Sequence, residues 1–129
     1  MKYLRFDYEG LLKDYESNKA LAKSLKKQIA YLEDGTGVKH GDLNYMDIVS
    51  NPDTLTELHK RWEEADFYVR LVDESFSSLR ERERETLRKF YIEGKTAEVC
   101  ADELFCSVRD FFRVKAVAFD QFKHIIYWR

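Results

Sequence analysis

Apolar residues recur three and four positions apart along most of this chain, which is the spacing of one face of a helix. From about residue 5 to residue 34 they form a heptad seam with a single polar member, Asn18: Tyr8, Leu11, Tyr15, Asn18, Ala22, Leu25, Ile29 and Leu32. A second seam with the same spacing follows: Leu58, Trp62, Ala65, Val69, Val72, Phe76 and Leu79. We expect the two helices to pair as an antiparallel hairpin, closed either within one chain or between two.

Residues 35–53 separate the two seams and are expected to form a loop. At about 19 residues this loop exceeds the usual connection length, and Leu43, Tyr45, Met46, Ile48 and Val49 predict that it packs in part on a surface. Pro52 suits the first turn of the second helix. No Gly or Pro separates that helix from residues 80–93, so we expect the helix to continue into them with little interruption.

The stretch from Leu79 to Phe122 predicts three further helices with two breaks. Ser77 and Ser78 are N-cap candidates for the first of these helices, and Gly94 is placed to end it in a left-handed conformation. The inward positions of this first helix are Leu87, Phe90 and Tyr91.

Thr96 is expected to cap the second helix, with Val99, Cys100 and Leu104 facing inward. Ser107 is expected to cap the third, and Asp110 three positions later gives an arrangement like a capping box. The buried side of the third helix is predicted to contain Phe111, Val114, Ala118 and Phe122.

A short helix, a tight corner at residues 105–106 and a longer helix make a helix-turn-helix pattern. Ala101 has the small side chain that a close helix crossing tolerates. The outer surface of the third helix includes Val108, Arg109, Phe112, Arg113, Lys115 and Ala116. Recognition helices read base edges with their N-terminal residues and use Arg and Lys for guanines and phosphates.

Many positions in this stretch agree, without gaps, with one known pattern: Leu79, Arg82, Glu83, Arg84, Leu87, Tyr91, Gly94, Lys95, Thr96, Ala101, Leu104, Cys106, Ser107, Phe111, Ala118 and Phe119. The segment resembles the promoter-recognition (region-four) domain of sigma factors. It is even more similar to the C-terminal domain of phage late-gene activators of the RinA/ArpU type. The resemblance covers roughly the last 50 residues and implies DNA binding by the third helix and control of transcription initiation.

The chain departs from that family at the turn, where Phe105 replaces the usual Gly. A bulky residue at positive φ costs on the order of 1 kcal/mol or more. The inner residue of the second helix is Cys100 instead of Ile, and the third helix is less basic than in typical members, with Asp110 and Phe112 in its first two turns.

Charge is distributed unevenly although the net charge of the 129 residues is only −2. Residues 1–78 carry 11 basic and 15 acidic side chains, whereas residues 79–129 carry 11 and 9. This mild asymmetry favours the C-terminal part as the one that meets nucleic acid. The Lys residues on the first helix are expected to form a solvated face.

Candidate chemistry is sparse. Cys100 and Cys106 are expected to be small buried residues, and the three histidines are scattered without zinc-ligand spacing. Because no carboxylate pair, nucleophile–base set or cofactor motif stands out, we expect neither an enzyme nor a cofactor. No apolar run reaches the roughly 18–20 residues that span a bilayer, and no signal peptide is visible. We therefore expect a cytoplasmic protein without membrane contact.

The predicted fold is all-α, with a helical hairpin over residues 1–78 and a helix-turn-helix domain over residues 79–129. The predicted function is sequence-specific binding of double-stranded DNA, with the helix from Ser107 to Phe122 in the major groove. The predicted DNA contacts are Thr96, Ser107, Val108, Arg109, Phe112, Arg113 and Lys115. The hairpin would form a homodimer or dock on RNA polymerase.

Two alternatives stay open. In the first, a sigma-like fold binds RNA polymerase or another regulator instead of DNA, as Phe105 and Phe112 suggest. In the second, the chain is a phage packaging subunit.

Overall fold

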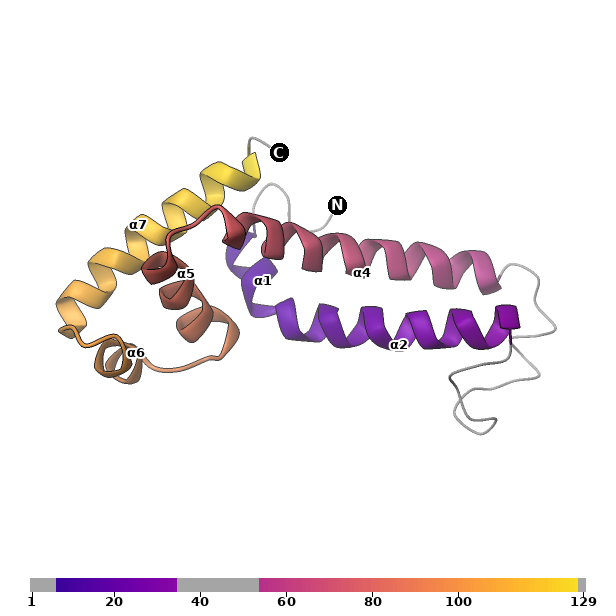
Figure 1. Cartoon of the computed structure of the whole chain (residues 1–129), viewed down its shortest axis with the longest axis horizontal. Helices are drawn as coiled ribbons and strands as arrows, with labels where there is room; N and C mark the ends of the chain where they lie inside the picture. Colours follow the sequence, from indigo (N-terminus) through magenta and orange to yellow (C-terminus); the bar gives the residue numbers. More distant parts are fainter. Residues whose placement is uncertain (1–6, 35–53, 128–129) are drawn as a thin grey trace. The chain divides into compact units, whose positions relative to one another are not determined.

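The computed structural model describes residues 7–34 and 54–127, and these residues are almost entirely helical (Figure 1). No strand occurs within these two ranges, so the predicted all-α class is confirmed. The elements are α1 (Tyr8–Lys13), α2 (Tyr15–Asp34), α4 (Thr54–Ser77), α5 (Glu81–Leu87), the π-helical turn η1 (Arg88–Ile92), α6 (Ala97–Glu103) and α7 (Val108–Tyr127). The predicted loop at 35–53, with Pro52, lies outside the described residues.

The chain divides into two compact units. Unit 1 contains residues 1–16 and 70–129, and unit 2 contains residues 17–69. The boundaries fall inside α2 and α4, so each of these helices contributes to both units. The separation into a hairpin over residues 1–78 and a helix-turn-helix domain over residues 79–129 stays a prediction.

Unit 2 is held together by apolar side chains at the predicted heptad positions. Leu25 and Ile29 of α2 form a buried cluster with Leu58 of α4. The partly buried side chains that pack against this cluster are Leu32, Leu55 and Trp62. At its edge, His59 Nε2 lies 3.0 Å from Glu33 Oε1. The end of α2 therefore lies beside the beginning of α4, and the two helices run side by side in unit 2 (Figure 1).

Asn18, the polar member of the first seam, carries a cost. Its side-chain nitrogen is buried and has no hydrogen-bond partner among the described residues. An unpaired buried donor destabilises the folded state by roughly 1–3 kcal/mol. Asn18 therefore lowers the stability of the seam instead of adding to it.

The core of unit 1 forms where α5, α6 and α7 pack together and α1 packs against η1. The apolar side chains that are at most 1% exposed in this unit are Leu11, Leu12, Val72, Leu87, Cys100, Phe111, Ala118 and Phe122. Phe111 and Phe122 are the largest of these, and both lie on α7. The predicted inner face of α7 is confirmed, with Val114 only partly buried.

The prediction of one long helix from residue 5 to residue 34 is wrong. Asp14 leaves the helical conformation, with φ −90° and ψ 4°, and separates α1 from α2. The neighbouring residues Leu11 and Leu12 are both fully buried. On a straight helix, adjacent side chains such as those of Leu11 and Leu12 point about 100° apart. To bury both while α1 packs against η1, the chain changes direction at Asp14.

The expected continuation of α4 into α5 is also wrong. The N–H groups of Ser78 and Leu79 donate to carbonyls only three residues back, at 3.2 and 3.0 Å, which tightens and ends α4. Arg80 is extended and is the N-cap of α5, with no side-chain capping bond. Ser77 and Ser78 are therefore not the caps, and the Ser77 hydroxyl donates to the Glu74 carbonyl instead. The break occurs without a Gly or Pro, and Leu79 is buried beside it.

Candidate nucleic-acid interface

Gly94 ends the helix before α6 as predicted. Its φ of 70° lies in the left-handed region, and a side chain there would be strained even though the space around it is open. The preceding turn is π-helical, with the Glu93 N–H donating to the Arg88 carbonyl at 2.8 Å. Across Gly94 the Lys95 N–H donates to the Lys89 carbonyl at 3.0 Å. These bonds fix where the chain enters α6.

Four charged side chains join the segment around Gly94 to the end of α6. Glu103, at the end of α6, accepts from Lys89 Nζ at 2.9 Å and from Lys95 Nζ at 2.8 Å. Lys95 Nζ also lies 3.0 Å from Glu93. Hydrogen bonds to Glu103 and Glu93 raise the pKa of Lys95 to about 12, and the bonds from Lys95 and Lys89 lower the pKa of Glu103. The side chains of the cluster are 19–36% exposed, so solvent screens part of its contribution to stability.

α6 packs against α7 through three buried residues. Cys100 and Ala101 form a cluster with Phe111, and all three are at most 2% exposed. Ala101 therefore lies at the close helix crossing, and burial raises the pKa of the Cys100 thiol. Thr96 caps α6 as predicted, because its hydroxyl accepts from the Val99 N–H at 3.3 Å. The expectation that Val99 faces inward is wrong, since it is 44% exposed.

The corner between α6 and α7 is formed by Phe105 in the left-handed region, with φ 57°. The Phe105 N–H donates to the Asp102 carbonyl, and the Cys106 N–H donates to the Ala101 carbonyl at 2.9 Å. The strain expected from the sequence at this position is therefore present. The Phe105 side chain is 95% exposed, so no burial of the ring offsets the strain within unit 1.

The first two turns of α7 expose the residues that the sequence places at a DNA interface. Ser107 caps the helix, because its hydroxyl accepts from the Asp110 N–H at 3.1 Å. Arg109 is exposed and has no ion pair within the described ranges. Val108 and Phe112 are 36% and 47% exposed. A basic side chain and two apolar ones thus share the start of α7.

Two of the predicted basic contacts already have partners. The guanidinium of Arg113 lies 3.2 Å from the Asp110 carboxylate, one turn earlier on the helix. The backbone N–H of Asp110 separately donates to the capping hydroxyl of Ser107. Lys115 Nζ lies 4.3 Å from the centre of the Phe90 ring and 5.6 Å from that of Phe112. Cation–π contacts of this kind stabilise by about 0.5–2 kcal/mol. Lys115 therefore packs on aromatic rings instead of extending freely into solvent.

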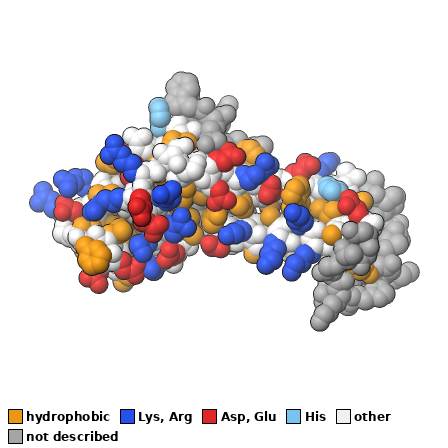
Figure 2. Space-filling view, in the orientation of Figure 1, with side chains coloured by type: hydrophobic (Ala, Val, Ile, Leu, Met, Phe, Trp, Pro, Cys, Tyr) orange, Lys and Arg blue, Asp and Glu red, His pale blue; other side chains and the backbone are white. Residues whose placement is uncertain are grey.

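On the face shown in Figure 2, basic and acidic side chains are interspersed over unit 1. The same mixture appears on α7, where Lys123 lies 3.5 Å from Asp120. The local positive charge counted from the sequence is therefore partly neutralised in the fold. Thr96 and Ser107 lie at different helix N-termini, and the structure gathers the other five predicted contacts onto α7 alone.

No family model, curated protein or solved structure matches this chain. The resemblance to sigma region four and to the RinA/ArpU-type activators therefore stays a prediction. No described helix is both long and apolar enough to cross a membrane. Across residues 7–34 and 54–127, no three His, Cys, Asp or Glu side chains come together as metal ligands.

Replacing Phe105 by Gly is expected to stabilise the protein. Glycine adopts positive φ without the clash of a Cβ, and little buried ring surface is lost, so the free energy of unfolding should rise by about 1 kcal/mol. Urea unfolding monitored by circular dichroism measures the change. The matched control is Phe112→Gly within α7, which should lower the free energy of unfolding by about 1 kcal/mol or more. Two changes of the same sign would contradict the assigned corner.

The Glu103 cluster predicts a specific loss of stability in acid. A carboxylate with a lowered pKa stabilises the fold fully above its unfolded pKa of about 4.3. This stabilisation disappears as the pH falls through the lower pKa of the folded state. Glu103→Gln should therefore be less stable than wild type at neutral pH, with a smaller loss on acidification.

Thermal unfolding of both proteins across the acid range measures this difference. Glu98→Gln is the control, because Glu98 is exposed on the same helix and has no ion pair among the described residues. Identical acid profiles for Glu103→Gln and wild type would contradict the role of the cluster.

Proposed function

We propose that this chain is a transcription regulator that binds double-stranded DNA through α7. The observation that carries the proposal is the division of the first two turns of this helix into two faces. Phe111 is fully buried against α6, whereas Arg109 and Arg113 on the opposite side are exposed. A helix held in this way by a shorter preceding helix is the arrangement that enters a major groove.

The contacts would divide into base-reading and backbone-positioning ones. Arg109 would donate both arms of its guanidinium to a guanine, and Val108 would contact a thymine methyl group. Arg113 would exchange Asp110 for a base or a phosphate. Thr96 and Ser107 would donate their hydroxyl protons to phosphates, because capping uses these oxygens only as acceptors.

Lys115 is assigned a contact with the DNA backbone. Its ammonium group lies over Phe90, Tyr91 and Phe112, so it would add positive potential beneath the interface and reach a phosphate at the rim. The two seams over residues 1–78 would form the antiparallel hairpin that dimerises the protein or docks on RNA polymerase.

Exposed apolar residues favour a second candidate, a protein-interaction module of sigma-like fold. Phe105 is almost fully exposed, and it occurs together with exposed Val99, Val108 and Phe112 on α6 and the start of α7. Large aromatic side chains of this kind are frequent anchors in protein interfaces. In this reading α7 binds RNA polymerase or another regulator, and Phe105 would be its principal contact.

The double variant Arg109→Ala and Arg113→Ala should lose sequence-specific DNA binding while its helicity and melting temperature stay unchanged. Both side chains are exposed, so their removal leaves the core intact, and each lost base contact costs about 1–3 kcal/mol. The measurement is selection of bound fragments from a random DNA pool at one fixed, near-physiological salt concentration, because phosphate contacts alone weaken steeply with salt.

A matched control removes the same charge elsewhere: Arg61→Ala and Arg82→Ala, both exposed and outside α7. The control should select the same DNA motif as wild type. Recovery of that motif by the Arg109/Arg113 variant would contradict the assignment of α7. Failure of wild type to select any motif would favour the interaction module, and RNA polymerase would be the next partner to test.

A further inference from the structure

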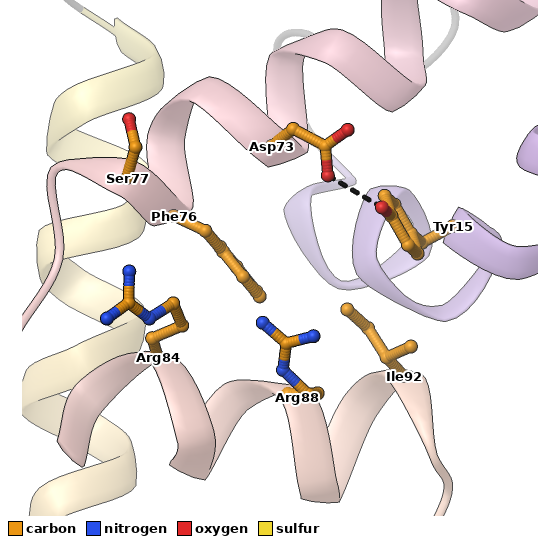
Figure 3. Close-up of a pocket in the computed structure, with 7 residues that line it drawn as sticks. All are labelled: Tyr15, Asp73, Phe76, Ser77, Arg84, Arg88 and Ile92. Atoms are coloured by element: carbon orange, nitrogen blue, oxygen red, sulfur yellow. Dashed lines mark hydrogen bonds between the residues drawn. The ribbon is translucent and has the colours of Figure 1, made fainter. Parts of the chain in front are cut away.

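A pocket of about 190 Å³ lies within unit 1, away from the interface on α7 (Figure 3). Its walls come from the start of α2, the end of α4, and α5 with η1. The lining residues are Tyr15, Asp73, Phe76, Ser77, Arg84, Arg88 and Ile92. Two guanidinium groups thus share a small pocket with the apolar side chains of Phe76 and Ile92.

The charge of these guanidinium groups is only partly balanced. Arg84 is half-buried and forms no ion pair with any described residue. Arg88 pairs with Glu85 through its Nε atom at 3.4 Å, which leaves its two terminal amino groups without an anionic partner in the described ranges. Its guanidinium lies 5.9 Å from the centre of the Phe76 ring. The pocket therefore contains hydrogen-bond donors that are positively charged and unsatisfied by acidic side chains.

The opposite wall carries one negative charge, the Asp73 carboxylate, which forms no ion pair with either arginine. Asp73 accepts a 2.6 Å hydrogen bond from the Tyr15 hydroxyl. Burial and this bond raise the pKa of Tyr15 to about 12, so the phenol stays protonated and remains the donor to Asp73. The Ser77 hydroxyl donates to the Glu74 carbonyl at 2.6 Å. The donors at the pocket that have no acidic partner among the described residues are accordingly those of Arg84 and the two terminal amino groups of Arg88, and Figure 3 shows these two side chains at the pocket.

The two arginines face the same pocket because they are four residues apart, and the π-helical turn brings Ile92 to the same face. Residues four apart on an α-helix advance by slightly more than one full turn, so a row at this spacing drifts around the helix. η1 begins at Arg88 and takes more residues per turn, which offsets the drift between Arg88 and Ile92. π-helical turns occur frequently at functional sites, and here the turn keeps Arg84, Arg88 and Ile92 on one face.

We propose that this pocket binds the phosphate group of a small organic phosphate monoester. Arg84 and Arg88, one helical turn apart, direct two guanidinium forks at the same space, which suits a tetrahedral oxyanion that carries up to two charges. A single guanidinium fork is enough to bind a planar carboxylate. The presence of two forks therefore favours phosphate over carboxylate as the ligand. Phe76 and Ile92 contact the organic part. Ligand pockets usually exceed about 300 Å³, so a compact ester fits this one best.

Calorimetric titration of the full chain with phenyl phosphate tests the proposal, with inorganic phosphate and benzoate as comparison ligands. The pH should be about 7.5, where the phosphate is largely dianionic. Phenyl phosphate should bind saturably at one site, more tightly than either comparison ligand. Arg84→Gln should weaken this binding by about tenfold or more, because it removes a charged fork. Arg82→Gln, an exposed arginine on the same helix, is the matched control and should bind like wild type.

Each contrary result overturns the proposal. These results are no saturable binding of phenyl phosphate, equal affinity in Arg84→Gln and wild type, and benzoate or inorganic phosphate binding as tightly as phenyl phosphate. Circular dichroism checks that Arg84→Gln is folded. If it is not, Arg84→Lys keeps the charge without the fork and should still weaken binding. The site does not depend on DNA binding by α7, because Arg84 lies outside that interface and the titration contains no DNA.

Discussion

The packing of Phe111 against α6 and η1 is the interaction on which the candidate interface depends. Its ring lies 5.8 Å from that of Phe90 and contacts Cys100 and Ala101, so one side chain joins three consecutive elements. The neighbouring rings extend this contact through Tyr91, Phe119 and Phe122 to Phe76 of α4. Because Phe111 and Phe122 are buried on one side of α7, Arg109 and Arg113 on the side opposite Phe111 remain exposed.

The basic side chains of unit 1 divide into those held by contacts within the fold and those that have no acidic partner among the described residues. Lys89 and Lys95 are held by Glu103, and Lys115 lies on aromatic rings, so these cations contribute mainly to the fold. Arg109 on α7 and Arg84 in the pocket have no acidic partner among the described residues. The two arginines lie at different places in unit 1, and we propose that Arg109 reads a base edge and that Arg84 binds a small phosphate. A DNA-binding helix and a separate ligand pocket in one unit would allow a small molecule to influence DNA binding.

Sequence periodicity predicted the helices well where one face is buried, as at Phe111, Ala118 and Phe122, and local capping rules predicted Thr96, Gly94 and Ser107. The breaks at Asp14 and Ser78 were missed because tertiary contacts cause them: Leu11 and Leu12 are buried together, and Leu79 turns into the core. The partner of Arg113 is Asp110, three residues away, and this pairing could have been predicted from helical spacing. Phe90, the ring nearest to Lys115, lies 25 residues away and is brought there only by the fold. The pocket could not be foreseen, since Tyr15 and Asp73 lie 58 residues apart and only the fold joins them. Its one local signal was the spacing of Arg84 and Arg88.

The central claim is that the start of α7 is the surface that meets DNA. The most direct measurement is an NMR titration of the labelled full chain with a short duplex recovered by selection, at the same fixed salt concentration. The account predicts that the largest amide shift changes fall between residues 107 and 116, with small changes over residues 54–69. Amide shift changes concentrated outside α7 would contradict this claim. The absence of any amide shift change at a saturating duplex concentration would contradict it as well.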